Sequence, residues 1–138
     1  MIRLTSGLCV VLFMACQSGV SLETDRSAYA LSSQGVEVSL KVENHSASEF
    51  TSPLCAARLE RSSEGPWATV SPAAEPVCIA SAQRVRPNTE AVRIMFIDPG
   101  VRAGTYRFVA TVDVSNSGSN EEIPTDSFEL TGPGDQVP

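Results

Sequence analysis

Few side chains in this sequence could do chemistry. His45 is the only histidine, and it lies between Asn44 and Ser46. A Ser-His-Asp mechanism needs an imidazole held by a carboxylate and placed against a serine hydroxyl, and triads are recognised by that geometry. Asn and Ser after an alternating segment are also typical turn residues. We therefore expect His45 to be a solvated turn residue, and we predict no catalytic residues.

The remaining candidate ligands do not suggest a metal or an acid–base pair. Glu121 and Glu122 are adjacent carboxylates, but acidic residues on the loops of an acidic protein are usually solvated, and no EF-hand spacing is present. Met95 and His45 alone give little support for a copper site. We expect no metal and no cofactor.

Two of the four cysteines, Cys55 and Cys78, predict a disulfide. Cys9 and Cys16 fall in the N-terminal segment, which leaves this pair with 22 residues between its members. A pair in an oxidising compartment most simply forms a structural bridge, which would stabilise the fold by about 3.5 kcal/mol. A redox pair normally has a spacing of two residues, and a metal site would need clustered Cys and His.

Trp67 is the best candidate for a binding contact, because tryptophan is enriched at interaction hot spots. A tryptophan that opens a short strand is also often a core or edge cap. Both readings stay open. The loops at Ser62–Pro66 and Ser115–Glu122 are the other surfaces where we expect contact.

The first sixteen residues predict export. Arg3 precedes an apolar run of eight residues, Leu8–Ala15, that stops at Cys16. A membrane-spanning helix needs about 20 residues, so the run has the shape of a signal peptide. The segment Leu12–Cys16 resembles a bacterial lipobox, in which Cys16 would be lipidated, although Phe13 is unusual there. Lipid anchoring is favoured over plain secretion.

Composition predicts one small acidic domain. The sequence has 138 residues and a net charge of −6, and removing residues 1–15 leaves 123 residues with a charge of −7. We expect a signal peptide at 1–15, the lipidated Cys16 with a short linker at 16–21, a folded domain at 22–131 and a flexible tail at 132–138. The acidic charge argues against nucleic acid as a partner, and leaves the lipid anchor as the contact with the membrane.

Apolar and polar residues alternate along most of the chain, which predicts β-strands. The predicted strands are Val20–Leu22, Tyr29–Leu31, Val36–Glu43, Leu54–Arg61, Trp67–Val70, Val77–Ile79, Ala91–Ile97, Tyr106–Asp113 and Phe128–Leu130. Turns are predicted at Ser32–Gly35, Asn44–Ser46 and Asp98–Gly100. Seven to nine short strands without a helical pattern predict an all-β, antiparallel β-sandwich.

One predicted strand, Ala91–Ile97, is apolar on both sides. Val92, Ile94 and Phe96 point one way and Arg93, Met95 and Ile97 the other. The apolar residues of the second side predict partial cover there.

Three fragments carry a family resemblance. They are Tyr29 before Val36–Leu40 with Asn44-x-Ser46, then Leu59–Arg61 leading to Gly65–Trp67, and then Gly104–Phe108. In this order they resemble bacterial immunoglobulin-like domains of exported lipoproteins, over most of residues 20–131. The resemblance implies an Ig-like sandwich and brings no catalytic residues. Gly104-x-Tyr106 also looks like a tyrosine corner, with ordinary core packing of Tyr106 as the alternative.

These observations predict a non-enzymatic, membrane-anchored Ig-like lipoprotein of the cell envelope with a binding or scaffolding role. Its partner would be an envelope protein or a polysaccharide. The alternative is a proteinase inhibitor on an Ig-like sandwich, with a rigid loop between Cys55 and Cys78 that contains Pro66, Pro72 and Pro76. An enzyme would need polar side chains that converge in one pocket.

Overall fold

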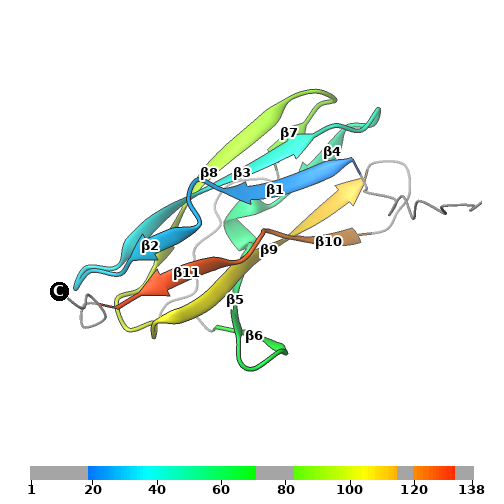
Figure 1. Ribbon diagram of the computed structural model, residues 1–138. Helices are drawn as coiled ribbons and strands as arrows, with labels where there is room; N and C mark the ends of the chain where they lie inside the picture. The colour runs from blue at the N-terminus through cyan, green and yellow to red at the C-terminus, as the bar shows by residue number, and fades with distance from the viewer. Residues whose placement is uncertain (1–18, 71–82, 115–119, 133–138) are drawn as a thin grey trace, which may run out of the picture.

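The computed structural model describes residues 19–70, 83–114 and 120–132, and these ranges form an all-β structure (Figure 1). The strands are β1 (Val20–Thr24), β2 (Ala28–Ala30), β3 (Val36–Asn44), β4 (Phe50–Ser52), β5 (Arg58–Ser62), β6 (Trp67–Thr69), β7 (Gln83–Val85), β8 (Glu90–Ile97), β9 (Gly104–Val114), β10 (Asn120–Pro124) and β11 (Phe128–Thr131). One short 3-10 helix, η1 (Leu54–Ala56), lies between β4 and β5. The predicted all-β class is confirmed. In these ranges no helix is both long enough and apolar enough to cross a membrane.

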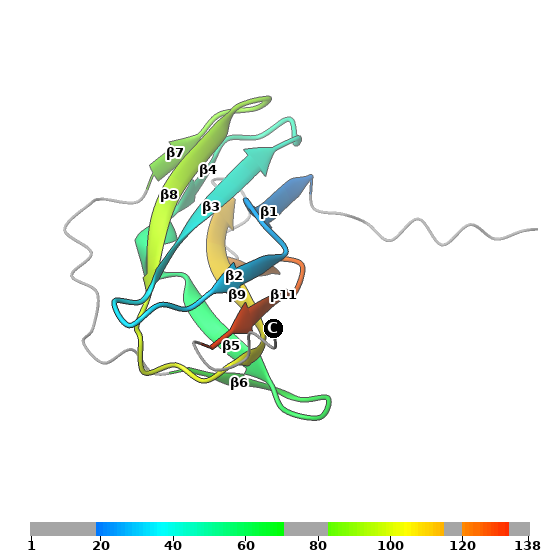
Figure 2. The same ribbon diagram turned by 60° about the vertical axis from the view of Figure 1, so that its left-hand side comes forward.

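The strands form two sheets that face one another (Figures 1 and 2). The smaller sheet has three antiparallel strands in the order β1-β3-β8, so β8 is one of its edges. The larger sheet has the order β2-β11-β9-β4-β7, and β5 and β10 also pair with the long central strand β9. β2 and β11 are parallel, whereas the other strand pairs are antiparallel.

Alternation along β3 and β9 builds the core between the sheets. Val38, Leu40 and Val42 of β3 are at most 1% exposed. They meet the inward residues of β9, which are Tyr106, Phe108, Ala110 and Val112. Both alternating segments were predicted, because one strand face is apolar and the other polar. Phe128 of β11 stacks with the rings of Tyr106 and Phe108 and meets the edge of Tyr29.

The predicted strands Val20–Leu22 and Tyr29–Leu31 are present as separate strands, and the structure shows that they lie in different sheets. β1 joins the smaller sheet and β2 the larger one. Between them Asp25 Oδ1 accepts hydrogen bonds from the Tyr29 hydroxyl at 2.6 Å and from the Ser39 N–H at 3.0 Å. Burial raises the pKa of Asp25, but these hydrogen bonds outweigh it and the pKa lies below its ordinary value. The carboxylate therefore fastens the crossover to β3.

The predicted turns are present. Gly35 N–H donates to the Ser32 carbonyl, and Val101 N–H donates to the Asp98 carbonyl. Gly35 has a φ of 90°, and a Cβ there would lie 2.5 Å from the Ile97 carbonyl oxygen. Both the left-handed backbone and the close approach to β8 require glycine at this position.

The predicted strand Leu54–Arg61 is wrong in its first half. Leu54–Ala56 forms η1, with Ala56 N–H bonded to the Pro53 carbonyl and Ala57 N–H bonded to the Leu54 carbonyl. Leu54 and the next residue, Cys55, are both buried, at 2% and 8% exposed. In a strand the side chains of Leu54 and Cys55 would point to opposite faces of the sheet, whereas the tight turn of η1 buries both of them.

Other boundaries differ from the sequence expectation as well. The described ranges contain eleven strands, more than the predicted seven to nine, because β4, β7 and β10 are short and carry no clear alternation. The predicted loop Ser115–Glu122 ends earlier, since Asn120–Glu122 belong to β10 and pair with β9. The predicted strand Val77–Ile79 lies outside the described residues.

Candidate binding surfaces

The cysteine and export predictions fall mostly outside the described residues. Cys55 lies in η1 and is 8% exposed, but Cys78 and Cys16 are not described. The disulfide Cys55–Cys78 and the lipidation of Cys16 therefore stay predictions.

The turn at His45 is built by Asn44. The Asn44 side chain is 1% exposed, and its amide donates to the carbonyls of Ser48 and Val85 at 2.8 and 2.9 Å. Its Oδ1 accepts hydrogen bonds from the N–H and the hydroxyl of Ser46. The His45 side chain is 61% exposed, and its Nε2 lies 2.9 Å from Glu43 Oε2. The Ser46 hydroxyl thus serves the turn and does not meet the imidazole.

The other chemical candidates are also separated or occupied. Glu122 lies on β10, where both carboxylate oxygens accept hydrogen bonds from Arg58, and Glu121 is exposed. Met95 packs against the core from β8. In the described ranges no group of three or more His, Cys, Asp or Glu residues could hold a metal ion.

Trp67 opens β6 and is half-buried beside a charge network. The guanidinium carbon of Arg107 lies 4.3 Å from the centre of the Trp67 ring, a cation–π distance. Arg107 Nε in turn donates to Glu60 Oε2 at 2.7 Å, and Arg58 Nε donates to Glu60 Oε1 at 3.0 Å. The ring therefore covers an arginine of its own fold.

Glu60 is the centre of that network and is 6% exposed. Burial raises its pKa, but the hydrogen bonds from Arg107 and Arg58 outweigh burial, so the pKa lies below its ordinary value of 4.5. The hydrogen bonds from Arg58 to Glu122 likewise raise the pKa of the guanidinium and lower that of Glu122. The network is a stabilising ion cluster on the outer face of the larger sheet.

A column of three apolar side chains lies on the outer face of β8. Val92, Ile94 and Phe96 are 50%, 55% and 58% exposed, and they are the large exposed hydrophobic residues of the described ranges. The alternation of β8 was predicted, but which of its two faces points to the core was not. Met95 and Ile97 were expected on an outer face with partial cover, whereas in the structure they face the core. We call Val92, Ile94 and Phe96 the β8 column.

Two exposed acidic side chains, Glu37 and Glu90, border the β8 column. The register places Phe96 opposite Glu37, Ile94 opposite Ser39 and Val92 opposite Lys41. Lys41 is already paired with Glu43 at 2.7 Å and with Glu23 at 3.4 Å. Glu90 begins β8 and is exposed, as is Glu37 on β3. This face of the smaller sheet is therefore an apolar edge bordered by excess negative charge.

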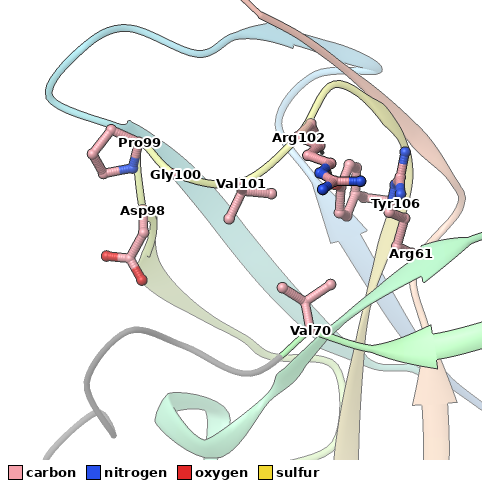
Figure 3. A pocket seen from close by; sticks show the side chains of 8 residues that line it. All are labelled: Arg61, Val70, Asp98, Pro99, Gly100, Val101, Arg102 and Tyr106. Atoms are coloured by element: carbon pink, nitrogen blue, oxygen red, sulfur yellow. Dashed lines mark hydrogen bonds between the residues drawn. The ribbon is translucent and has the colours of Figure 1, made fainter.

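A pocket of about 560 Å³ lies beside the turn that follows β8 (Figure 3). Among the described residues, its lining includes Arg61, Val70, Asp98, Pro99, Gly100, Val101, Arg102 and Tyr106. Figure 3 shows Val70 and Val101 facing one another, with Arg61 and Arg102 near Tyr106 and with Asp98 at the opposite end. Trp67 does not line it.

Tyr106 ties this pocket to the core. Its ring is 1% exposed, and its hydroxyl donates to the Arg102 carbonyl at 2.5 Å, four residues upstream. This is the geometry of a tyrosine corner, and the residue also packs in the core. Burial raises the pKa of Tyr106, while the charges of Arg61 and Arg102 act in the opposite direction.

Sequence reasoning found the turn at Asp98–Gly100 and the Gly104-x-Tyr106 motif, but it did not single out Arg61 and Arg102. These arginines come from β5 and from the segment before β9. They are 41 positions apart, and no local pattern predicts that they line one pocket. The pairing of β5 with β9, from Arg58–Val109 to Arg61–Tyr106, brings them together.

Comparisons with known proteins find similarity in structure but none in sequence family. No protein-family model matches the chain, and no curated protein matches it in sequence. Among solved structures, a PapD-like (ASH) domain of human CEP192 is similar, with 15% identity and a TM-score of 0.47, covering 95% of this chain and 96% of that one. The structural-genomics target SoR45 has 14% identity and a TM-score of 0.43, covering 86% of this chain and 88% of the other.

Proposed function

We propose that this chain is an exported, lipid-anchored and non-enzymatic binding module of the bacterial cell envelope. It takes an extended segment of a partner protein along the edge strand β8. The observation that carries this proposal is the β8 column, Val92, Ile94 and Phe96, which leaves three large apolar side chains in a row on a sheet edge.

An edge strand with an apolar face is a liability unless a partner covers it. Single exposed apolar residues are normal on proteins, but a contiguous row on an unpaired strand favours association. Within the described ranges β8 pairs with β3 on one side alone. In an antiparallel pair every second residue turns its backbone N–H and C=O away from the neighbouring strand. The free edge can therefore accept another strand, with the β8 column as its side-chain contact.

The charges beside the β8 column determine which partner segments can bind there. Glu37 and Glu90 border the β8 column, and Lys41 is neutralised by Glu23 and Glu43. A partner segment with alternating apolar residues and basic residues at its ends would complement this surface, whereas an acidic segment would be repelled. The three side chains of the column are apolar and offer no hydrogen-bond donor or acceptor. This favours a protein over a polysaccharide, because sugar hydroxyls would lose water there without gaining partners.

The test uses a synthetic peptide of alternating valine and threonine with lysines at both ends. Fluorescence anisotropy should show binding to the exported chain and no binding of the same peptide with terminal glutamates. Ile94→Asp should abolish binding, because it places a charge in the middle of the column. Ala68→Asp adds the same charge to an exposed position of β6 and should leave binding unchanged.

Two results would overturn this assignment. One is equal binding of the lysine and glutamate peptides, or retention of binding by Ile94→Asp. The other is a concentration-dependent dimer of the chain that Ile94→Asp abolishes in sedimentation experiments, since the β8 column would then be covered by a second copy.

A further inference from the structure

We infer that the pocket beside the β8–β9 turn binds a small organic anion, with a carboxylate at Arg61 and Arg102 and an apolar body against Val70 and Val101. This inference is independent of the proposed role of the β8 column. Its basis is the combination, in one cavity, of an apolar wall and two arginines that have no carboxylate partner within the described ranges.

Arg61 is positioned but incompletely bonded. Its Nη2 donates to the Ala103 carbonyl at 3.1 Å, and its side chain lies over Gly104, where a Cβ would come within 3.1 Å of Nε. Its Nε is buried and has no hydrogen-bond partner in the described structure. A buried charged group with an unused donor is costly, so an anion at this guanidinium would be stabilising.

Arg102 supplies the second positive charge. Arg102 is exposed. Among the described residues, no carboxylate oxygen lies within 4 Å of the guanidinium nitrogens of Arg102 or Arg61. The other arginines near a carboxylate, such as Arg58 and Arg107, are engaged with Glu60. Figure 3 shows Asp98 at the far end of the pocket from the two guanidinium groups. The arginine end is therefore the place for a negative charge.

The apolar residues of the cavity determine what kind of group the ligand carries besides its carboxylate. Val70 and Val101 face one another and Pro99 lies beside Asp98 (Figure 3). The volume of about 560 Å³ falls within the usual range of small-molecule sites. An inorganic anion would leave the apolar wall uncovered, so the fit favours a carboxylate that carries a short hydrocarbon chain.

The experiment titrates the exported chain with hexanoate and follows backbone amide and methyl signals by NMR. We expect shifts at Val70, Val101 and Arg102, and none with hexanamide, which has the same body but no charge. Arg102→Gln should weaken hexanoate binding about tenfold, the loss of one charge-assisted contact. Arg86→Gln removes another exposed positive charge that does not line the pocket, and it should not weaken hexanoate binding.

Equal shifts with hexanamide, or unchanged affinity in Arg102→Gln, would overturn the role of the arginines. Acetate binding as tight as hexanoate binding would overturn the role of the apolar wall. Because Arg102 is exposed and its backbone bond to Tyr106 is kept, the variant is expected to fold, and its amide spectrum verifies this.

Discussion

The Tyr106 hydroxyl donates a hydrogen bond to the carbonyl oxygen of Arg102 at 2.5 Å, and this bond joins the core to the candidate pocket. The ring is packed against Phe128, while the acceptor belongs to the segment that leads into β9. One side chain therefore both fills the sandwich and fixes the backbone from which the Arg102 side chain extends.

Removing this hydroxyl should affect both stability and binding. Tyr106→Phe removes the hydrogen bond to the Arg102 carbonyl, and we expect a loss of about 1–2 kcal/mol in the free energy of unfolding by urea. Hexanoate affinity should fall as well, because the Arg102 backbone is released. Tyr29→Phe is the matched control, since it also removes a buried hydroxyl bond, to Asp25, but lies away from the pocket lining. Equal loss of hexanoate binding in both variants would contradict the positioning role of Tyr106.

Neutralising Glu60 should destabilise the larger sheet in a pH-dependent way. Glu60→Gln leaves Arg58 and Arg107 without their shared carboxylate and should cost roughly 1–3 kcal/mol at neutral pH. The folded pKa of Glu60 is depressed, so its stabilisation is complete above the ordinary value of 4.5 and is lost as the pH falls through the folded pKa. The difference between variant and parent should therefore shrink in acid.

Urea unfolding at neutral and acidic pH measures this difference. Glu122→Gln is the control, because this carboxylate is 60% exposed and should contribute little. A Glu60→Gln difference that stays constant across the acidic range would contradict the assigned direction of the pKa shift.

The Asn44 side chain should contribute more to the stability of the fold than the His45 side chain beside it. Asn44→Ala removes both amide bonds, to Ser48 and Val85, as well as the acceptor for Ser46. We expect a loss of about 2–3 kcal/mol in unfolding free energy, because the Val85 carbonyl loses a buried donor. His45→Ala should leave the unfolding midpoint unchanged. A larger effect from His45→Ala would contradict the structural reading of this turn.

Strands with one apolar and one polar face could be predicted from sequence, as in β3 and β9, because only one register buries Val38 and Leu40 or Tyr106 and Phe108. β8 shows the limit of this reasoning. Both of its faces are apolar, so alternation alone could not decide whether Ile94 or Met95 lies outside.

The tight turn at Cys55 and the pocket could not be predicted from local sequence patterns, because both depend on contacts between several elements. Leu54–Ala56 forms a tight helical turn in which both Leu54 and Cys55 are buried, and the alternation of Cys55, Ala57 and Leu59 did not reveal it. Arg61 and Arg102 meet through the pairing of β5 with β9, which is a tertiary contact without a local signature. The tyrosine corner was accessible from sequence because its donor and acceptor lie four residues apart.

The most direct test of the role of the β8 column is to map the binding of the lysine-flanked peptide onto the protein by NMR. The account predicts that the largest amide shifts fall on Val92, Ile94 and Phe96 of β8 and on the neighbouring β3. Shifts concentrated at Ser62–Pro66, or no shifts at any concentration of the peptide, would contradict it.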